Sequence, residues 1–241
     1  MSKLSSACVA EALGAFMLSF IGAGAICLNT WQGHGGAGLL GIAIAHGLAL
    51  SIAVSATMNV SGGHVNPAVT VAMLATGRIG AGNAIAYIVS QLVGATIAGA
   101  LIAAIFSGLK VGDQSVMVAA KLGTPTFDPA VISTGTAILI EVLLTFLLIF
   151  AIFGTAVDPR APKIGGFGIG LTIAADILVG GPLTGASMNP SRTFGPGLVA
   201  AVRGALPEFG SQQVVYWVGP IVGAVLAALI YHHLILEKKK S

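Results

Sequence analysis

The sequence predicts an all-α membrane protein in which six transmembrane helices and two half-helices form an inverted repeat. Apolar residues make up 56% of the 241 residues and charged residues only 8%, with a mean hydropathy of +0.96. No soluble domain of this size leaves so little polar surface facing water. Six apolar segments are long enough to cross a bilayer, and an Asn-Pro pair opens a shorter apolar run in each half of the chain.

The six spans follow from segment length and hydropathy. They are expected at about 5–28, 38–58, 82–106, 131–156, 165–181 and 212–236. Glycine, proline and polar residues mark breaks at 29–37, 107–130, 157–164 and 204–211. The first segment is too long for the apolar core of a signal peptide and contains Glu11, so we interpret it as a span.

Each Asn-Pro pair has the local sequence of a helix start. The two motifs are Asn66, Pro67 and Ala68, and Asn189, Pro190 and Ser191. Asparagine is a strong N-cap, and proline fits the first helical turn. The runs that follow, about 67–77 and 190–203, are too short to cross a bilayer. We therefore predict two half-helices whose positive ends point into one buried polar path.

The two halves of the chain resemble each other. Residues 10–20 echo residues 140–150, and Val93-Gly94 is matched by Val218-Gly219. Repeat one covers about 5–106 and repeat two about 131–236, joined by the loop 107–130. An odd number of spans in each repeat inverts the second copy. The half-helices are then expected to enter from opposite faces and to meet near the middle of the membrane.

The basic residues predict that both termini are cytoplasmic. That orientation places seven of them inside and three outside, as the positive-inside rule requires. The inner set is Lys3, Arg78, Arg160, Lys163, Lys238, Lys239 and Lys240, and the outer set is Lys110, Lys121 and Arg203. The net charge of +3 is small and the basic residues are scattered or terminal, so no nucleic-acid partner is indicated.

Enzymatic chemistry is not indicated. The sequence has no nucleophile–base set, no phosphate-binding glycine loop and no cluster with metal-ligand spacing. Cys8 and Cys27 both fall in the first span, 19 residues apart, too far to form a disulfide. We expect no catalytic residues, no cofactor and no metal.

The paired Asn-Pro motifs within six spans closely resemble the aquaporin (major intrinsic protein) family over essentially the whole chain. The first motif matches the family's Asn-Pro-Ala, whereas Ser191 replaces the alanine of the second. Residues 45–50, 61–70 and 155–159 look most like the plant tonoplast intrinsic proteins. The resemblance implies one channel domain over 1–241, a homotetramer in the lipid bilayer and passive passage of water. The cell membrane is the expected location, with the vacuolar membrane as the alternative.

The resemblance also implies a selectivity constriction. Its residues are His46, Ile177, Ala186 and Arg192. Orthodox members carry phenylalanine in the second span and histidine in the fifth, so His46 and the smaller Ile177 imply a wider pore. Thr193 follows the arginine where glycerol-conducting members have aspartate. Because His46 and Ile177 imply a wider constriction, a broader pore for ammonia, glycerol or other small neutral solutes remains the alternative.

Several polar residues have a structural and a functional interpretation. Asn66 and Asn189 could be simple caps, but their duplication in a membrane favours pore donors to water, with helix dipoles opposing cations. Arg192 is costly at membrane depth unless it faces a wet cavity, which favours a filter role over a salt bridge. His46 is favoured as pore-lining over a core histidine. His64 is expected to hold its loop.

Glu11 and Glu141 are intramembrane carboxylates, for which a functional role is the default hypothesis. They could couple a secondary transporter to protons. Alternatively, each accepts hydrogen bonds from amides of a non-helical loop, which must be satisfied inside the membrane. One carboxylate and one loop per repeat favour the second interpretation. Asp176 has no such symmetric counterpart, and the one role that its place beside Ile177 indicates is to anchor the outer vestibule.

Overall fold

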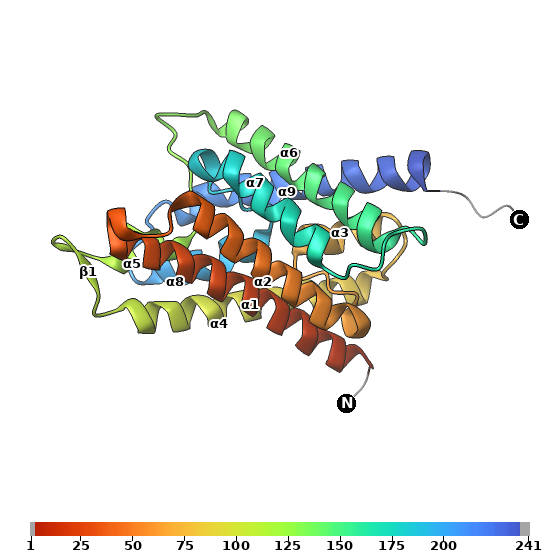
Figure 1. Cartoon of the computed structure of the whole chain (residues 1–241), viewed down its shortest axis with the longest axis horizontal. Helices are drawn as coiled ribbons and strands as arrows, with labels where there is room; N and C mark the ends of the chain where they lie inside the picture. The colour runs from red at the N-terminus through yellow and green to blue at the C-terminus, as the bar shows by residue number, and fades with distance from the viewer. Residues whose placement is uncertain (1–2, 237–241) are drawn as a thin grey trace, which may run out of the picture.

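The computed structural model describes residues 3–236 and is almost wholly helical (Figure 1). Within them, six helices have the length and hydropathy of membrane spans. They are α1 (Lys3–Gln32), α2 (Gly38–Ser61), α4 (Ala81–Phe106), α6 (Thr134–Ile152), α7 (Phe167–Thr184) and α9 (Phe209–Ile230). Two shorter helices, α3 (Pro67–Ala75) and α8 (Pro190–Val202), lie between them in sequence. This order confirms the predicted fold class, with helix ends shifted by a few residues.

The helices run roughly along the long axis of the molecule, so the bundle has two ends. α1 begins and α9 finishes at the same end, at the right of Figure 1. We call this the inner end, after the orientation that the basic residues predict. Arg78, Arg160 and Lys163 belong to inner connections, whereas Lys110, Lys121 and Arg203 belong to outer ones. Lys238, Lys239 and Lys240 lie outside the described residues.

The loop between the repeats contains more structure than its composition indicates. A hairpin joins β1 (Lys110–Val111) and β2 (Gln114–Ser115), which are antiparallel with Lys110 opposite Ser115. α5 (Val116–Ala119) and the 3₁₀ turn η2 (Lys121–Gly123) follow. Elements this short show no apolar periodicity, so the sequence marked the segment only as a break. The remaining turns are the 3₁₀ segment η1 (Gly33–Gly35) and the π-helical segments η3 (Phe153–Val157) and η4 (Tyr231–Ile235).

Small residues let the long helices approach closely. A methyl group added at Gly94 of α4 would lie 2.0 Å from the carbonyl oxygen of Ala12 in α1. One added at Gly223 of α9 would lie 2.2 Å from the carbonyl oxygen of Val142 in α6. Lipid supplies no hydrophobic drive between helices, so such backbone contact replaces it. The same contact in both repeats supports the internal symmetry.

The outer surface of the bundle carries large apolar side chains. Leu40, Leu143 and Leu171 are each more than half exposed, and large apolar side chains more than a third exposed recur along all six spans. An exposed apolar surface this extensive is stable only against lipid tails. The chain is a multi-pass integral membrane protein.

Candidate functional site

Both half-helices begin at a side-chain cap inside the bundle. Asn66 has an extended backbone, and its Oδ1 accepts a hydrogen bond from Ala68 N at 2.8 Å. Asn189 Oδ1 accepts from Ser191 N at 3.0 Å and from Arg192 N at 3.3 Å. Each cap satisfies amides that the first turn of a helix leaves without an intrahelical partner.

The two caps also bond across to each other's loops. Asn66 Nδ2 donates to the carbonyl oxygen of Met188 at 2.8 Å, and Asn189 Nδ2 donates to that of Val65 at 3.1 Å. Val65 and Met188 have φ of 56° and 52°, a left-handed backbone that only firm surroundings sustain in such residues. An amide NH₂ has two hydrogens, so each asparagine keeps one donor beyond this bond.

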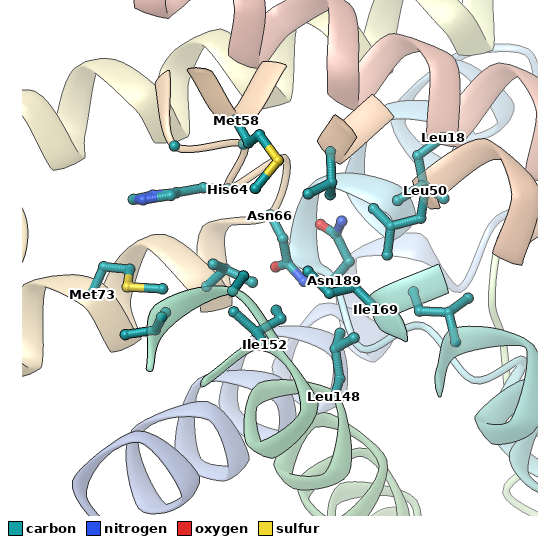
Figure 2. Close-up of a pocket in the computed structure, with 17 residues that line it drawn as sticks. Leu18, Leu50, Met58, His64, Asn66, Met73, Leu148, Ile152, Ile169 and Asn189 are labelled. Carbon is teal, nitrogen blue, oxygen red and sulfur yellow. The ribbon is translucent and has the colours of Figure 1, made fainter. Parts of the chain in front are cut away.

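An inner cavity of about 170 Å³ reaches both asparagines. Figure 2 shows the Asn66 and Asn189 side chains next to each other at its centre. Most of the remaining wall is apolar and includes Leu18, Leu50, Leu148, Ile152 and Ile169. Apart from the His64 ring, the side chains that offer water hydrogen bonds in this cavity are the two asparagines, which lie between the half-helix N-termini.

Glu11 lies behind the first half-helix loop and is fully buried. Its carboxylate accepts hydrogen bonds from four donors. They are Ser61 Oγ at 2.6 Å, His64 N at 2.9 Å, Val65 N at 2.6 Å and Gln91 Nε2 at 2.6 Å. Glu11 does not line the inner cavity. Its carboxylate satisfies loop amides that the membrane interior would otherwise leave unpaired.

Glu141 occupies the equivalent place in repeat two and is also fully buried. It accepts from Thr184 Oγ1 at 2.7 Å, Ser187 N at 2.9 Å and Met188 N at 2.8 Å. It lines neither the inner cavity nor the outer one described below. The two carboxylates thus have matching contacts, with the loop and not with a transport path.

Sequence reasoning missed two tyrosines that complete these networks. Tyr87 OH donates to the carbonyl oxygen of Ser61 at 2.9 Å, and Tyr216 OH donates to that of Thr184 at 2.8 Å. Both tyrosines come from the last span of a repeat. A polar side chain on the buried face of an otherwise apolar span was the available signal.

The outer side of the site is built around His46 and Arg192. His46 Nδ1 lies 2.8 Å from the carbonyl oxygen of Ile42, which can only accept, so Nδ1 carries the hydrogen. Its Nε2 then accepts from Arg192 Nε at 3.3 Å and Nη2 at 3.0 Å. A methyl group at Gly22 of α1 would lie 2.3 Å from this Nε2, so glycine there leaves room for the ring.

Arg192 is buried, and within residues 3–236 its Nη1 has no hydrogen-bond partner. A buried guanidinium nitrogen without a partner is unfavourable unless water or a solute reaches it. An outer cavity of about 370 Å³ lies on this side and is lined by His46 and Ile177 among others. Ala186 is buried in the adjacent loop with φ of 44° and lines neither cavity.

Two further polar residues have contacts that the sequence did not specify. His64 Nδ1 is 3.1 Å from Thr70 Oγ1, and the ring also lines the inner cavity (Figure 2). Asp176 is buried in α7 but lines neither cavity, and its Oδ2 has no hydrogen-bond partner in the described chain. Among residues 3–236, no three histidine, cysteine or acidic side chains could hold a metal.

Six spans surround two half-helices, and the capped N-termini of these half-helices meet beside a polar path. This arrangement defines a membrane channel. The profile of the family described as "Major intrinsic protein" matches residues 1–231 of the chain. This chain belongs to the major intrinsic protein family, the aquaporins, whose members are channels and not enzymes.

Relatives and a solved structure agree with this assignment. The chain is 43% identical to "Aquaporin TIP4-4" of Zea mays over 96% of its length and 87% of the relative's. It is 43% identical to "Probable aquaporin TIP3-2" of Arabidopsis thaliana over 95% of its length and 84% of the relative's. An X-ray structure of the aquaglyceroporin from Plasmodium falciparum shares the fold with a TM-score of 0.82. That match has 23% identity and covers 96% of this chain and 97% of the other.

Proposed function

We propose that the protein is a passive water channel that excludes ions and protons and assembles as a homotetramer with cytoplasmic termini. The observation that carries the proposal is the meeting of Asn66 and Asn189 in one cavity, each with an amide hydrogen to spare. These hydrogens would donate to the oxygen of a passing water. The positive ends of both half-helices would oppose a cation at the same place.

Arg192 supplies a second barrier on the outer side. Its fixed positive charge repels cations, and its unpartnered Nη1 is a donor suited to water oxygen. Two separate donor sites, the asparagines at the half-helix junction and the arginine on its outer side, would bind a file of water.

The alternative is a broader pore that also passes ammonia, glycerol or similar neutral solutes. Ile177 favours it, because this side chain lines the outer cavity where a second ring would narrow the path. The relatives are named as aquaporins, whereas the solved structure that shares the fold is an aquaglyceroporin.

A proton-coupled carrier is the rival from another class. It requires a carboxylate that exchanges protons along the transport path. Glu11 and Glu141 instead hold loop donors and line neither cavity, which argues against such coupling.

Stopped-flow shrinkage of proteoliposomes tests all three functions. The water channel predicts fast water flux with a low activation energy and no dependence on a pH gradient. Slow uptake of glycerol and ammonia relative to water separates it from the broader pore. Solute uptake driven by a proton gradient, or water flux equal to that of empty liposomes, would refute the proposal.

A further inference from the structure

One wall of the outer cavity comes from the loop between the repeats and not from a membrane-spanning helix. Thr124, Pro125 and Thr126 line this cavity together with His46 and Ile177. Residues 124–126 follow the turn η2 and lie outside both repeats. The shape of the solute path at its outer side therefore depends on what holds this loop in place.

Gln212 of α9 holds the loop by its backbone. Its Nε2 donates to the carbonyl oxygen of Phe127 at 2.9 Å, and its Oε1 accepts from Phe127 N at 3.3 Å. This pair of bonds satisfies the backbone of one residue as a neighbouring strand would. Gln212 is 6% exposed, and the Phe127 side chain packs against Val215 and Tyr216 of the same helix.

Comparison of the two repeats shows that Gln212 is not needed for the half-helix loop. The contacts match Gly94 with Gly223 and Tyr87 with Tyr216, so Gln212 takes the position of Asn83 and Pro220 that of Gln91. In repeat one, Tyr87 bonds the Ser61 carbonyl and Gln91 bonds Glu11. In repeat two, Tyr216 bonds the equivalent carbonyl of Thr184. The side chain of Gln212 bonds the connecting loop instead.

The loop is held in a strained conformation beside this clamp. Lys121, Leu122 and Gly123 are consecutive residues with φ of 47°, 51° and 67°. A left-handed backbone at non-glycine residues persists only when the surroundings fix it. Lys121 Nζ pairs with Glu208 Oε1 at 2.5 Å, and a methyl group at Gly185 would lie 2.7 Å from Pro125 Cα. The loop is therefore wedged against both the α8–α9 connection and the second half-helix loop.

The wall carries an unused polar group. The Thr124 side chain is 7% exposed, lines the outer cavity, and its Oγ1 has no hydrogen-bond partner among residues 3–236. A buried hydroxyl without a partner is unfavourable unless a water or solute in the cavity supplies one.

We propose that Gln212 is a positioning residue for solute selectivity, which clamps the Phe127 backbone so that residues 124–126 form a fixed wall of the solute path. The Thr124 hydroxyl is the group in this wall that contacts the solute. The inference rests on the proposed channel function. It goes beyond the constriction expected at His46, Ile177, Ala186 and Arg192, because it assigns part of the selectivity to the connecting loop.

The test compares Gln212→Met with Gln213→Met in proteoliposomes. Methionine keeps the volume of glutamine and removes both bonds to Phe127. Gln213 lies next to it on α9 and bonds Trp217 of the same helix, so its replacement is a matched control. We expect the ratio of glycerol to water permeability to rise about fivefold in Gln212→Met, the effect of one ordinary hydrogen bond on a barrier. It should not change in Gln213→Met.

The positioning role of Gln212 would be refuted if well-folded Gln212→Met had the same ratio of glycerol to water permeability as the parent protein. An equal change of this ratio in Gln212→Met and Gln213→Met would refute it as well. Thr124→Val provides a test that does not depend on the clamp variant folding, since valine keeps the shape of threonine without the hydroxyl. It should lower water permeability per channel about fivefold. Parent permeability in Thr124→Val would overturn the role of the wall. Water flux of the parent protein no faster than that of empty liposomes would instead refute the channel function itself.

Discussion

Replacing Glu141 with glutamine tests whether the intramembrane carboxylates support loops or take part in transport. Glu141 Oε1 accepts from Thr184 Oγ1 and Ser187 N, and Oε2 accepts from Met188 N. Glutamine keeps one acceptor oxygen, but its NH₂ group faces the Met188 N–H, so two donors meet without an acceptor. A buried unpaired donor costs about 1–3 kcal/mol, and the two remaining bonds lose the strength that the charge gives them. The free energy of unfolding should fall by about 2–4 kcal/mol.

The same change at Glu11 gives an internal comparison. Gln91 Nε2 donates to Glu11, and Gln91 Oε1 has no hydrogen-bond partner among the described residues. Rotating the Gln91 amide by half a turn would offer this oxygen to the new NH₂ group. Repeat two has Pro220 at that position, and its side chain has no amide that could compensate. Glu11→Gln should therefore destabilise the protein by about 1 kcal/mol less than Glu141→Gln.

Thermal unfolding of the purified variants gives their order of stability, and stopped-flow gives the water permeability of the folded fraction. We expect both variants to conduct water like the parent protein once permeability is divided by the amount of folded channel. Loss of all flux in well-folded Glu141→Gln would refute the structural interpretation. Equal destabilisation by the two changes would show that Gln91 does not compensate.

The remaining predictions concern the filter and the inner end. Arg192→Val should raise cation leak while water flux persists, because it removes the fixed charge and the donors; conductance equal to the parent's would contradict this. His46→Phe should reduce ammonia flux more than water flux, because it deletes a polar partner and narrows the path; equal losses would mean that His46 sets only the width. Mercurials should block water flux weakly in the parent and strongly in Ala186→Cys. Strong block that survives replacement of both native cysteines would show that the constriction is misplaced. At the inner end, Arg160 bonds Asp158 and holds the pKa of that carboxyl below its ordinary range. The pair's contribution to the free energy of unfolding is then fully present above the pKa of Asp158 in the unfolded chain, about 3.9. It is lost as the pH falls through the lower pKa of the folded protein. The stability of the parent, measured by thermal unfolding, should therefore fall in strong acid more than that of Asp158→Asn. An equal fall in the two proteins would exclude the Asp158–Arg160 pair as its source.

The sequence by itself determined the spans, the half-helices and the class of protein. Span length and hydropathy are properties of a single segment, because each helix must satisfy its own backbone in lipid. The Asn-Pro starts are equally local, since the cap of Asn66 bonds the amide of Ala68 two residues away. The repeat then predicted that the two starts meet, because inversion follows from an odd number of spans.

Only the tertiary structure decided which groups meet across the chain. The bonds of Asn66 to Met188, Arg192 to His46 and Gln212 to Phe127 join residues 122, 146 and 85 positions apart. Each depends on the rotation and register of packed helices, which close contacts such as Gly94 against Ala12 set. The connecting loop shows the same limit. Its left-handed turn at Lys121 has no local signal, because the contacts that hold the strained backbone come from elsewhere in the fold.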